Sequence, residues 1–388
     1  MPRTAMTLSA LVTATGLLFA LSACQPNDQS GAKDDGTISV TSTDDKCEVS
    51  ATEASSGTLR FDVKNDGSKV TEFYLLGEDG LRIVGEVENI APGLNRTLTV
   101  SAPEGKYFTA CKPGMVGDGI RGDFTVTKGE AGDQADAQDS QLKDQATSQY
   151  ASYVKDQAEQ LLSGTKEFAQ AYKNGDDDKA RELYAPVRMH WERIEPVAES
   201  FGDLDPKLDL READLEDGQK WTGWHRIEKD LWPPATGYTA LAQKDRDALA
   251  DQLVTDTQTL HDRTRDITFT ADQLSNGAKE LLDEVATGKV TGEEETWSHT
   301  DLWDFQANVD GARIAYEDLS PLLKKRDTEL DSTLKTRFKD LQKLLDQYKE
   351  GDGFVTYDKL SKDDVKKLSD AVNALSEPLS TVTDKVVE

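Results

Sequence analysis

The sequence predicts two domains of different fold class: an N-terminal all-β sandwich over residues 37–128 and a C-terminal all-α helical bundle over residues 146–388. Three observations predict this division. Short runs of alternating apolar and polar residues end near Thr127, a stretch without large apolar residues follows, and apolar residues then recur with a period of about 3.6. A chain of 388 residues is long enough for each part to bury its own core.

Residues 1–23 have the pattern of a targeting segment rather than of a folded element. Arg3 supplies a positive charge, and the apolar run Leu8–Leu21 is too short for a stable membrane-spanning helix. The run ends in Leu21-Ser22-Ala23-Cys24, which resembles a bacterial lipobox, with Cys24 as the lipid-attachment residue; the alternative is an ordinary secretory signal with a stray cysteine. Residues 24–36 then form a polar tether. We therefore expect an exported protein, anchored by lipid to the outer face of the cell membrane, in the cell envelope or periplasm.

The β domain is indicated by short alternating runs such as Gly57–Val63 and Asn95–Val100. Turn sequences separate these runs, namely Asn65-Asp66-Gly67, Glu78-Asp79-Gly80 and Pro92-Gly93. Six to eight strands in about ninety residues are typical of a small β-sandwich.

Residues 129–145 have no apolar side chain larger than Ala over Gly129–Asp139 and predict a linker. Beyond them Tyr150, Val154, Ala158 and Leu161 mark the apolar face of a first helix, and similar patterns continue to the C-terminus. Seven or so helices of moderate length predict a bundle.

The chain is strongly acidic, with 30% charged residues, a formal net charge of -28 and a pI near 4.5. It therefore offers no cationic field for nucleic acid or for an anionic membrane surface, so the lipid is the only membrane contact that we expect. The charge is compatible with attracting cations, although a solvated acidic surface also accounts for much of it.

A histidine and three glutamates in the helical part could bind one metal ion. His225 and Glu228 are three positions apart, which places them on one face of a helix, and Glu192 and Glu195 repeat this spacing on an expected helix over Met189–Ser200. Two carboxylates that close repel unless a cation lies between them. One imidazole with carboxylates suits iron or zinc and also accepts manganese or copper(II). Alternatively, the glutamates form a solvated face and His225 is a packed core residue.

The other histidines carry weaker signals. His190 lies on an apolar face and is expected to be packed, whereas His261 is expected at the surface. Before the helix expected near Thr300, Ser298 or Thr300 could act as the cap, with Asp301 in the first turn. The carboxylates of Glu293-Glu294-Glu295 could reach a metal ion from another element; alternatively, most of them serve the helix dipole.

Four segments carry a resemblance to a known family: Asn89–Gly93, Glu192–Phe201, Trp221–Glu228 and Ser298–Asn308. With these segments the chain resembles the iron-uptake members of the imelysin superfamily, in the long form that has an N-terminal cupredoxin-like domain. The segments cover both halves and most of the chain, and their combination is specific although each piece alone is not.

The resemblance implies an iron-binding protein that passes iron to a membrane iron permease, in a system that also contains a haem-dependent peroxidase. Iron is the implied ion, with copper or zinc as further candidates. The alternatives are a metal-dependent enzyme, either a metallopeptidase or a ferroxidase, and a polysaccharide-binding surface module. Against a zincin-type peptidase, the His-x-x-Glu pair lacks the second histidine of such a helix. The implied metal ligands are Glu192, Glu195, Asp209, His225 and Glu228, with Glu294 as a weaker addition.

The β domain departs from the blue-copper pattern that a cupredoxin resemblance suggests. A type-one copper site uses two histidines, a cysteine and an axial methionine, but residues 37–128 contain no histidine. With Cys24 assigned to lipid, Cys47 and Cys111 remain. In an oxidising compartment they are candidates for a disulfide; alternatively they form a divergent metal site with Glu72 and Met115.

Overall fold

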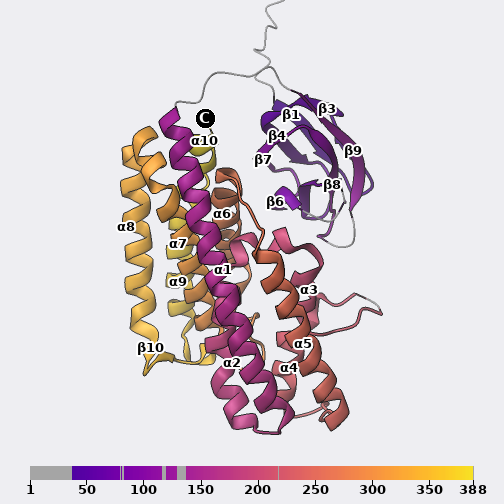
Figure 1. Cartoon of the computed structure of the whole chain (residues 1–388), viewed down its shortest axis with the longest axis vertical. Coiled ribbons are helices and arrows are strands. Elements are labelled where there is room, and N and C mark those ends of the chain that lie inside the picture. Colours follow the sequence, from indigo (N-terminus) through magenta and orange to yellow (C-terminus); the bar gives the residue numbers. More distant parts are fainter. Residues whose placement is uncertain are drawn as a thin grey trace, which may run out of the picture. The chain divides into compact units, whose positions relative to one another are not determined.

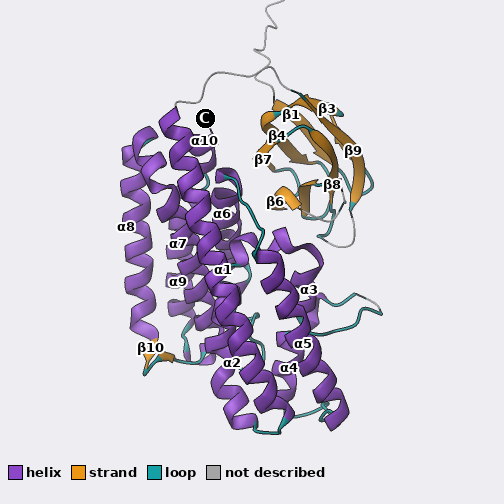
Figure 2. Ribbon diagram, viewed as in Figure 1, coloured by secondary structure: helices purple, strands orange, loops and turns teal. Residues whose placement is uncertain are grey.

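The computed structural model describes residues 37–78, 80, 83–115, 119–128, 137–216 and 218–387. The targeting segment, the tether and the lipid-attachment residue Cys24 lie outside these residues. The predicted fold classes are confirmed: a β-sandwich comes first in the chain and a helical bundle follows it (Figures 1 and 2).

The sandwich consists of two sheets with strand orders β2-β1-β4-β7 and β3-β9-β8-β5-β6. Strand β1 runs parallel to β4, whereas β4 and β7 pair antiparallel. Phe61, Phe73 and Phe124 fill the core between the sheets, with ring centroids 5.2 and 5.6 Å from that of Phe61. The strands are β1 (Thr37–Ser42), β2 (Cys47–Val49), β3 (Glu53–Ser55), β4 (Gly57–Asn65), β5 (Thr71–Leu76), β6 (Ile83–Ile90), β7 (Asn95–Ala102), β8 (Gly105–Cys111) and β9 (Ile120–Thr127).

The helical domain packs long helices side by side (Figure 1). Helix α1 contacts α2, α5 and α7 along its length, while α6 packs on α7 and α9, and α8 packs on both α7 and α9. The helices are α1 (Ala137–Lys173), α2 (Asp177–Glu192), α3 (Asp205–Leu208), α4 (Trp224–Leu231), α5 (Gln243–Thr264), α6 (Ala271–Thr287), α7 (Asp301–Arg326), α8 (Thr328–Leu345), α9 (Lys362–Leu379) and α10 (Val382–Val387). A two-stranded ribbon, β10 (Lys349–Glu350) and β11 (Gly353–Phe354), follows α8.

Helix α1 begins at Ala137, inside the segment 129–145 for which we expected a linker. The expectation rested on the lack of large apolar residues. However, Gln and Lys are good helix formers, and Leu142 packs against the bundle core, so the helix extends about two and a half turns further toward the N-terminus.

Short connections between the long helices form much of the candidate site. The 3-10 helices η1 (Glu195–Leu204) and η2 (Glu212–Asp214), together with α3, occupy the acidic region between α2 and α4. A further 3-10 helix, η3 (Lys289–Thr291), precedes the Glu293–Glu295 turn that leads into α7. These segments bring residues far apart in the sequence to one place.

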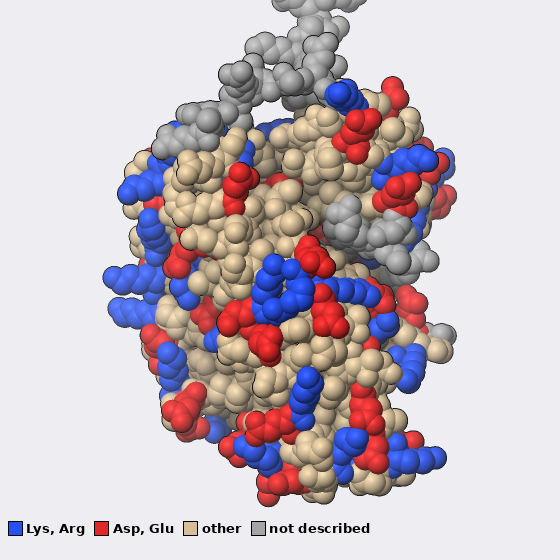
Figure 3. Space-filling view, viewed as in Figure 1, with Lys and Arg blue, Asp and Glu red and all other residues tan. Residues whose placement is uncertain are grey.

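On the face shown in Figure 3, Lys and Arg side chains are interspersed with Asp and Glu. None of the helices in the described ranges combines the length and the apolar character that crossing a membrane requires.

Candidate metal centre

Gly223 fixes the start of the helix that carries His225 and Glu228. Its backbone has φ 86°, a conformation that favours glycine, and a Cβ atom at this position would lie 2.1 Å from the carbonyl oxygen of Leu208. The chain therefore passes directly against the residue before Asp209. This close approach explains why a glycine precedes the histidine, because it sets α4 beside the acidic segment.

His225 is 1% exposed and faces carboxylates on both sides of its ring. Nε2 lies 3.3 Å from Oδ1 of Asp209 and 3.5 Å from Oε1 of Glu294. Nδ1 lies 3.4 Å from Oε2 of Glu228 and 4.0 Å from Oε1 of Glu295. Two overlapping groups result, Asp209–His225–Glu294 and His225–Glu228–Glu295, and within each group the potential ligand atoms lie within 4.8 Å of one another.

The Nε2 atom of His225 has no hydrogen bond of good geometry to any described residue, although it is buried. An unpaired buried polar atom is costly unless another partner completes it. A nitrogen with two adjacent carboxylate oxygens is a suitable donor set for iron, zinc or manganese. The residues therefore fit a divalent or trivalent transition-metal cation.

Glu228 is held in place by the turn that precedes α7. Its Oε1 accepts hydrogen bonds from the backbone N–H groups of Trp297 and Ser298, at 3.0 and 2.7 Å. Its Oε2 is the oxygen nearest to Nδ1 of His225. The carboxylate thus connects the imidazole to the backbone of another segment.

Asp209 is oriented by two neighbouring side chains. The indole Nε1 of Trp191 donates to its Oδ2 at 2.8 Å, and the guanidinium of Arg188 donates to both of its carboxylate oxygens. Asp209 immediately follows the short helix α3. The family resemblance implied Asp209 as a ligand, and the structure brings it to His225.

Glu192 and Glu195 do not share one helix as we expected. Helix α2 ends at Glu192, and η1 begins at Glu195, because Pro196 disfavours a continuing α-helix through the residue before it. Their side chains still converge, but on Lys289: its Nζ lies 3.0 Å from Glu192 Oε2 and 2.7 Å from both oxygens of Glu195. The amide of Asn308 donates to both carboxylates, at 2.8 and 2.6 Å.

Several residues at the centre were not predicted as site residues. Arg188 and Lys289, which are 0% and 2% exposed, supply the cations, while Glu295, Asp304 and Asn308 add buried oxygens. Only Arg188 had a local signal, because it lies four positions before Glu192, and that spacing brings the two side chains together on α2. For most of the three consecutive glutamates that include Glu295, we favoured a role at the dipole of the next helix over one at a metal ion.

The carboxylates outnumber the cations at this centre. Arg188, Lys289 and His225 lie among seven acidic side chains: Glu192, Glu195, Asp209, Glu228, Glu294, Glu295 and Asp304. Part of the repulsion is relieved by protonation. Burial and the neighbouring Glu192 raise the pKa of Glu195, and burial with the neighbouring Glu228 raises that of Glu295 to about 7.

The groups nearest the cations titrate in the opposite direction. Although burial opposes ionisation, Arg188 and Lys289 lower the pKa of Glu192 to about 2, and Lys289 and His225 hold the pKa of Glu294 well below its usual value. Burial and Arg188 oppose a charge on His225, but the neighbouring carboxylates of Glu228, Glu294 and Glu295 raise the pKa of the imidazole to about 9. In the absence of a metal ion, His225 is therefore an imidazolium at neutral pH.

The cluster is open to solvent on the side of Asp209 and Glu294. Both residues line a cavity whose wall also includes Glu195, Glu284 and Arg211. Close by, Trp221 and Trp297 lie with ring centroids 5.8 Å apart and with the Lys229 ammonium over both rings.

The remaining histidines lie away from this cluster. His190 is half-buried and its Nδ1 lies 2.9 Å from the amide oxygen of Gln157, while His261 contacts Glu159 and Asp262. His299 has a positive φ of 56° just before α7. Thr300 is the N-cap of α7 but makes no side-chain cap, whereas Asp301 accepts a hydrogen bond from the backbone of Glu295.

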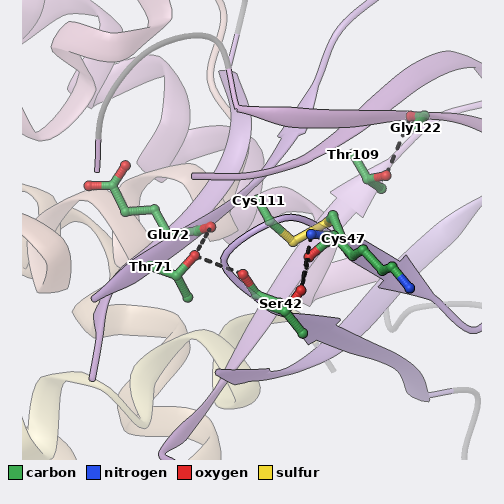
Figure 4. The surroundings of a disulfide bond; sticks show 9 residues. Ser42, Cys47, Thr71, Glu72, Thr109, Cys111 and Gly122 are labelled. Carbon is green, nitrogen blue, oxygen red and sulfur yellow. Dashed lines mark hydrogen bonds between the residues drawn. A yellow bond between two sulfur atoms is a disulfide. The ribbon is translucent and has the colours of Figure 1, made fainter. Parts of the chain in front are cut away.

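In the β-sandwich, Cys47 and Cys111 form a disulfide that joins β2 of one sheet to β8 of the other. The carboxylate of Glu72 points away from the sulfur atoms (Figure 4) and accepts a hydrogen bond from Tyr74 at 2.7 Å. Met115 is 40% exposed. These four residues therefore do not form the divergent metal site that we considered as the alternative to a disulfide.

Two family models match the chain. The imelysin model, which also carries a peptidase label, matches residues 146–382, and a cupredoxin-like domain model matches residues 11–126.

Curated relatives match nearly the whole chain. The "Iron uptake system component EfeO" of Escherichia coli K12 is 40% identical over 353 residues, which cover 90% of this chain and 91% of the relative. The protein of the same name from Shigella flexneri matches equally. Among solved structures, a putative iron-regulated protein A precursor from Parabacteroides distasonis shares the fold, with a TM-score of 0.50 at 18% identity, covering 63% of this chain and 95% of that one.

Proposed function

The chain belongs to the EfeO family of iron uptake system components, and from that membership we propose that it captures iron outside the cytoplasm and passes it to a membrane iron permease. In this proposal a haem-dependent peroxidase belongs to the same system, and a lipid on Cys24 keeps the carrier at the outer face of the membrane. The disulfide between Cys47 and Cys111 supports an oxidising, extracytoplasmic location.

The observation that carries the proposal is the unpaired Nε2 of buried His225, aimed at Asp209 and Glu294. These three side chains are the proposed ligands of the iron. The donor set also suits zinc, manganese and copper(II), so the choice of iron rests on the relatives. Arrival from the solvent-open side places the ion against Asp209 and Glu294 first.

The other predicted ligands have different proposed roles. Glu228 accepts from Nδ1 of His225 and so directs the Nε2 lone pair at the ion, in the way that carboxylates commonly support metal-binding histidines. Glu192 and Glu195 are bound to Lys289, and they contribute negative potential rather than a direct bond to the ion. Glu294 thus moves from the weakest candidate ligand to one of the three proposed ligands.

A carrier must release its cargo. Carboxylate and imidazole ligands bind less tightly as protons compete for them, and the cluster is open to solvent on one side. These features suit reversible binding better than a closed structural site.

The test is iron binding by the purified mature chain, with ferrous ammonium sulfate under argon and with ferric nitrilotriacetate, followed by gel filtration and metal analysis. We expect about one bound ion per chain in the wild type, and a large loss in His225→Ala and Asp209→Asn. Asp310→Asn is the matched control, because Asp310 pairs with Arg193 and contacts none of the proposed ligands.

Two results would overturn the proposal: no iron on the wild-type protein, or undiminished iron on His225→Ala. Catalytic consumption of Fe²⁺ or of a peptide by the wild type, lost in Glu228→Gln, would instead indicate an enzyme. Delivery is measured separately, as iron transfer from the loaded chain to the permease reconstituted in vesicles.

A further inference from the structure

We infer that Arg188 is a built-in counter-ion of the metal centre, which holds two of the iron ligands while the centre is empty and moves to Asp304 when iron binds. This inference deepens the proposed function and rests on it. It assigns the reversibility of binding to one buried guanidinium.

Arg188 is 0% exposed and lies among five carboxylates. On the side of His225 it donates to Asp209 and, at 3.2 Å, to Oε1 of Glu294. On the inner side its nitrogens lie 2.6 Å from Oε1 of Glu192 and 2.6 Å from Oε1 of Glu295. Apart from the imidazolium of His225, no other cation in the described residues contacts both Asp209 and Glu294.

Arg188 and the Nε2 atom of His225 approach the same oxygen atoms. Oδ1 of Asp209 and Oε1 of Glu294 lie 3.3 and 3.5 Å from Nε2 of the imidazole, and both are also contacted by the guanidinium. A metal ion bound to Nε2 and to these oxygens would be repelled by a guanidinium that keeps the same oxygens. The ion and Arg188 therefore compete for the two carboxylates.

Asp304 is the acceptor that can receive the displaced guanidinium. It is 1% exposed on α7, and neither of its oxygens has a hydrogen bond of good geometry to a described residue, although its carboxyl group lies next to that of Glu295. Its Oδ2 lies 3.6 Å from Nε of Arg188, just beyond a hydrogen bond. The guanidinium could gain a well-formed bond to this carboxylate by a short movement away from Asp209.

The exchange gives the centre a means of release. When iron leaves, the guanidinium returns to Asp209 and Glu294. These buried carboxylates therefore have a positively charged partner both with and without iron. Displacing Arg188 costs free energy, so the net affinity for iron is lower than the ligands alone would give. A lower affinity suits a carrier, because a carrier must release its ion.

The two ends of the exchange give opposite predictions in a titration with Fe²⁺ under argon. Arg188→Gln removes the competitor, so we expect the affinity for Fe²⁺ to rise at least about tenfold and dissociation into a chelator to slow. Asp304→Asn removes the second acceptor and leaves Arg188 on the ligands, so we expect the affinity to fall. Arg188→Lys retains the charge without the forked donor geometry, and should give an intermediate affinity.

Arg193→Gln is the control, because Arg193 lies one position after Glu192 but pairs with Asp310 and does not contact the proposed ligands. Its affinity should equal that of the wild type. If Arg188 only stabilised the structure, the Arg188→Gln variant would bind Fe²⁺ more weakly than the wild type. A higher affinity therefore distinguishes a competing counter-ion from a structural residue.

If Arg188→Gln unfolds without metal, circular dichroism during titration with Fe²⁺ becomes the measurement. Recovery of the helical signal would support the inference, since iron would then replace the missing cation. An unchanged or lower affinity in a folded Arg188→Gln protein, or no recovery in an unfolded one, would overturn it. Absence of iron on the wild type would instead refute the proposed function.

Discussion

Glu228 lies behind His225, with its Oε2 3.4 Å from Nδ1 of the imidazole, while Nε2 faces the opposite pair of carboxylates. Because Oε1 of the same side chain is bonded to two backbone N–H groups, the carboxylate has little freedom to leave the imidazole for a metal ion. The i and i+3 spacing of His225 and Glu228 suggested two metal ligands on one helix face. Instead, it brings together one proposed ligand, His225, and the carboxylate that orients it.

Replacing Glu228 with glutamine should weaken iron binding without abolishing it. The neutral amide has one acceptor oxygen, which cannot serve both the backbone N–H groups and Nδ1–H, and it lacks the charge that supports the imidazole, so we expect the affinity to fall roughly 10–100-fold with the stoichiometry unchanged at saturation. Calorimetry under argon measures both quantities. Glu212→Gln, at an exposed partner of Lys229, serves as the control. A complete loss of binding, as in His225→Ala, would make Glu228 a ligand after all.

Gly223→Ala should damage the fold and the site together. The new Cβ would collide with the carbonyl of Leu208 in a backbone region that disfavours alanine, so the free energy of unfolding should fall by at least about 2 kcal/mol. Iron affinity should also fall, because Asp209 follows Leu208. Gly237→Ala is a matched control with φ 79° and no neighbour within 4 Å, and should cost only about 1 kcal/mol. Urea unfolding compares the two; equal losses would contradict the prediction.

Iron binding should release a proton from His225. The pKa of the imidazole is raised to about 9, so at pH 7 the metal-free protein carries the proton that a metal at Nε2 must displace. Affinity for Fe²⁺ should therefore rise by roughly tenfold per pH unit between pH 6 and 8, and fall toward acid pH. Calorimetry in PIPES and MOPS, whose ionisation enthalpies differ, counts the released protons. A flat affinity with no proton release would show that His225 does not bind the ion.

Reducing the disulfide should destabilise the sandwich and leave iron binding intact. Cys47 and Cys111 are 64 positions apart, and opening such a loop is expected to cost about 2–4 kcal/mol of unfolding free energy. The double variant Cys47→Ser/Cys111→Ser, compared with the wild type by urea unfolding and by metal analysis, tests both statements. A lower metal content in this variant would mean that the cysteines contribute to a metal site.

The two fold classes could be predicted because they depend on local periodicity, which alternates along Gly57–Val63 and repeats every three to four residues after Tyr150. The prediction that Glu195 lies on the same helix as Glu192 was wrong, although Pro196 indicated a break in the helix at this point. Boundaries failed where composition was ambiguous, as at Ala137.

Of the candidate site, the residues held together by helical spacing could be found from the sequence, and those from distant segments could not. Arg188 and Asp304 lie on different helices, and Lys289 follows a third, so no local spacing relates them to His225. Asp209 was selected by the family resemblance, and Glu294 was at first only one of three consecutive glutamates that could reach a metal ion. Tertiary packing brings them to the imidazole, whereas their service as iron ligands stays a prediction.

The indole pair of Trp221 and Trp297 lies beside this centre, and the backbone of Trp297 is bonded to Glu228. Bound iron ions quench the emission of nearby indoles, so loading and unloading should each change the intrinsic fluorescence of the chain. The protein thus carries its own optical reporter, and the kinetics of capture and delivery can be followed in real time without an attached dye.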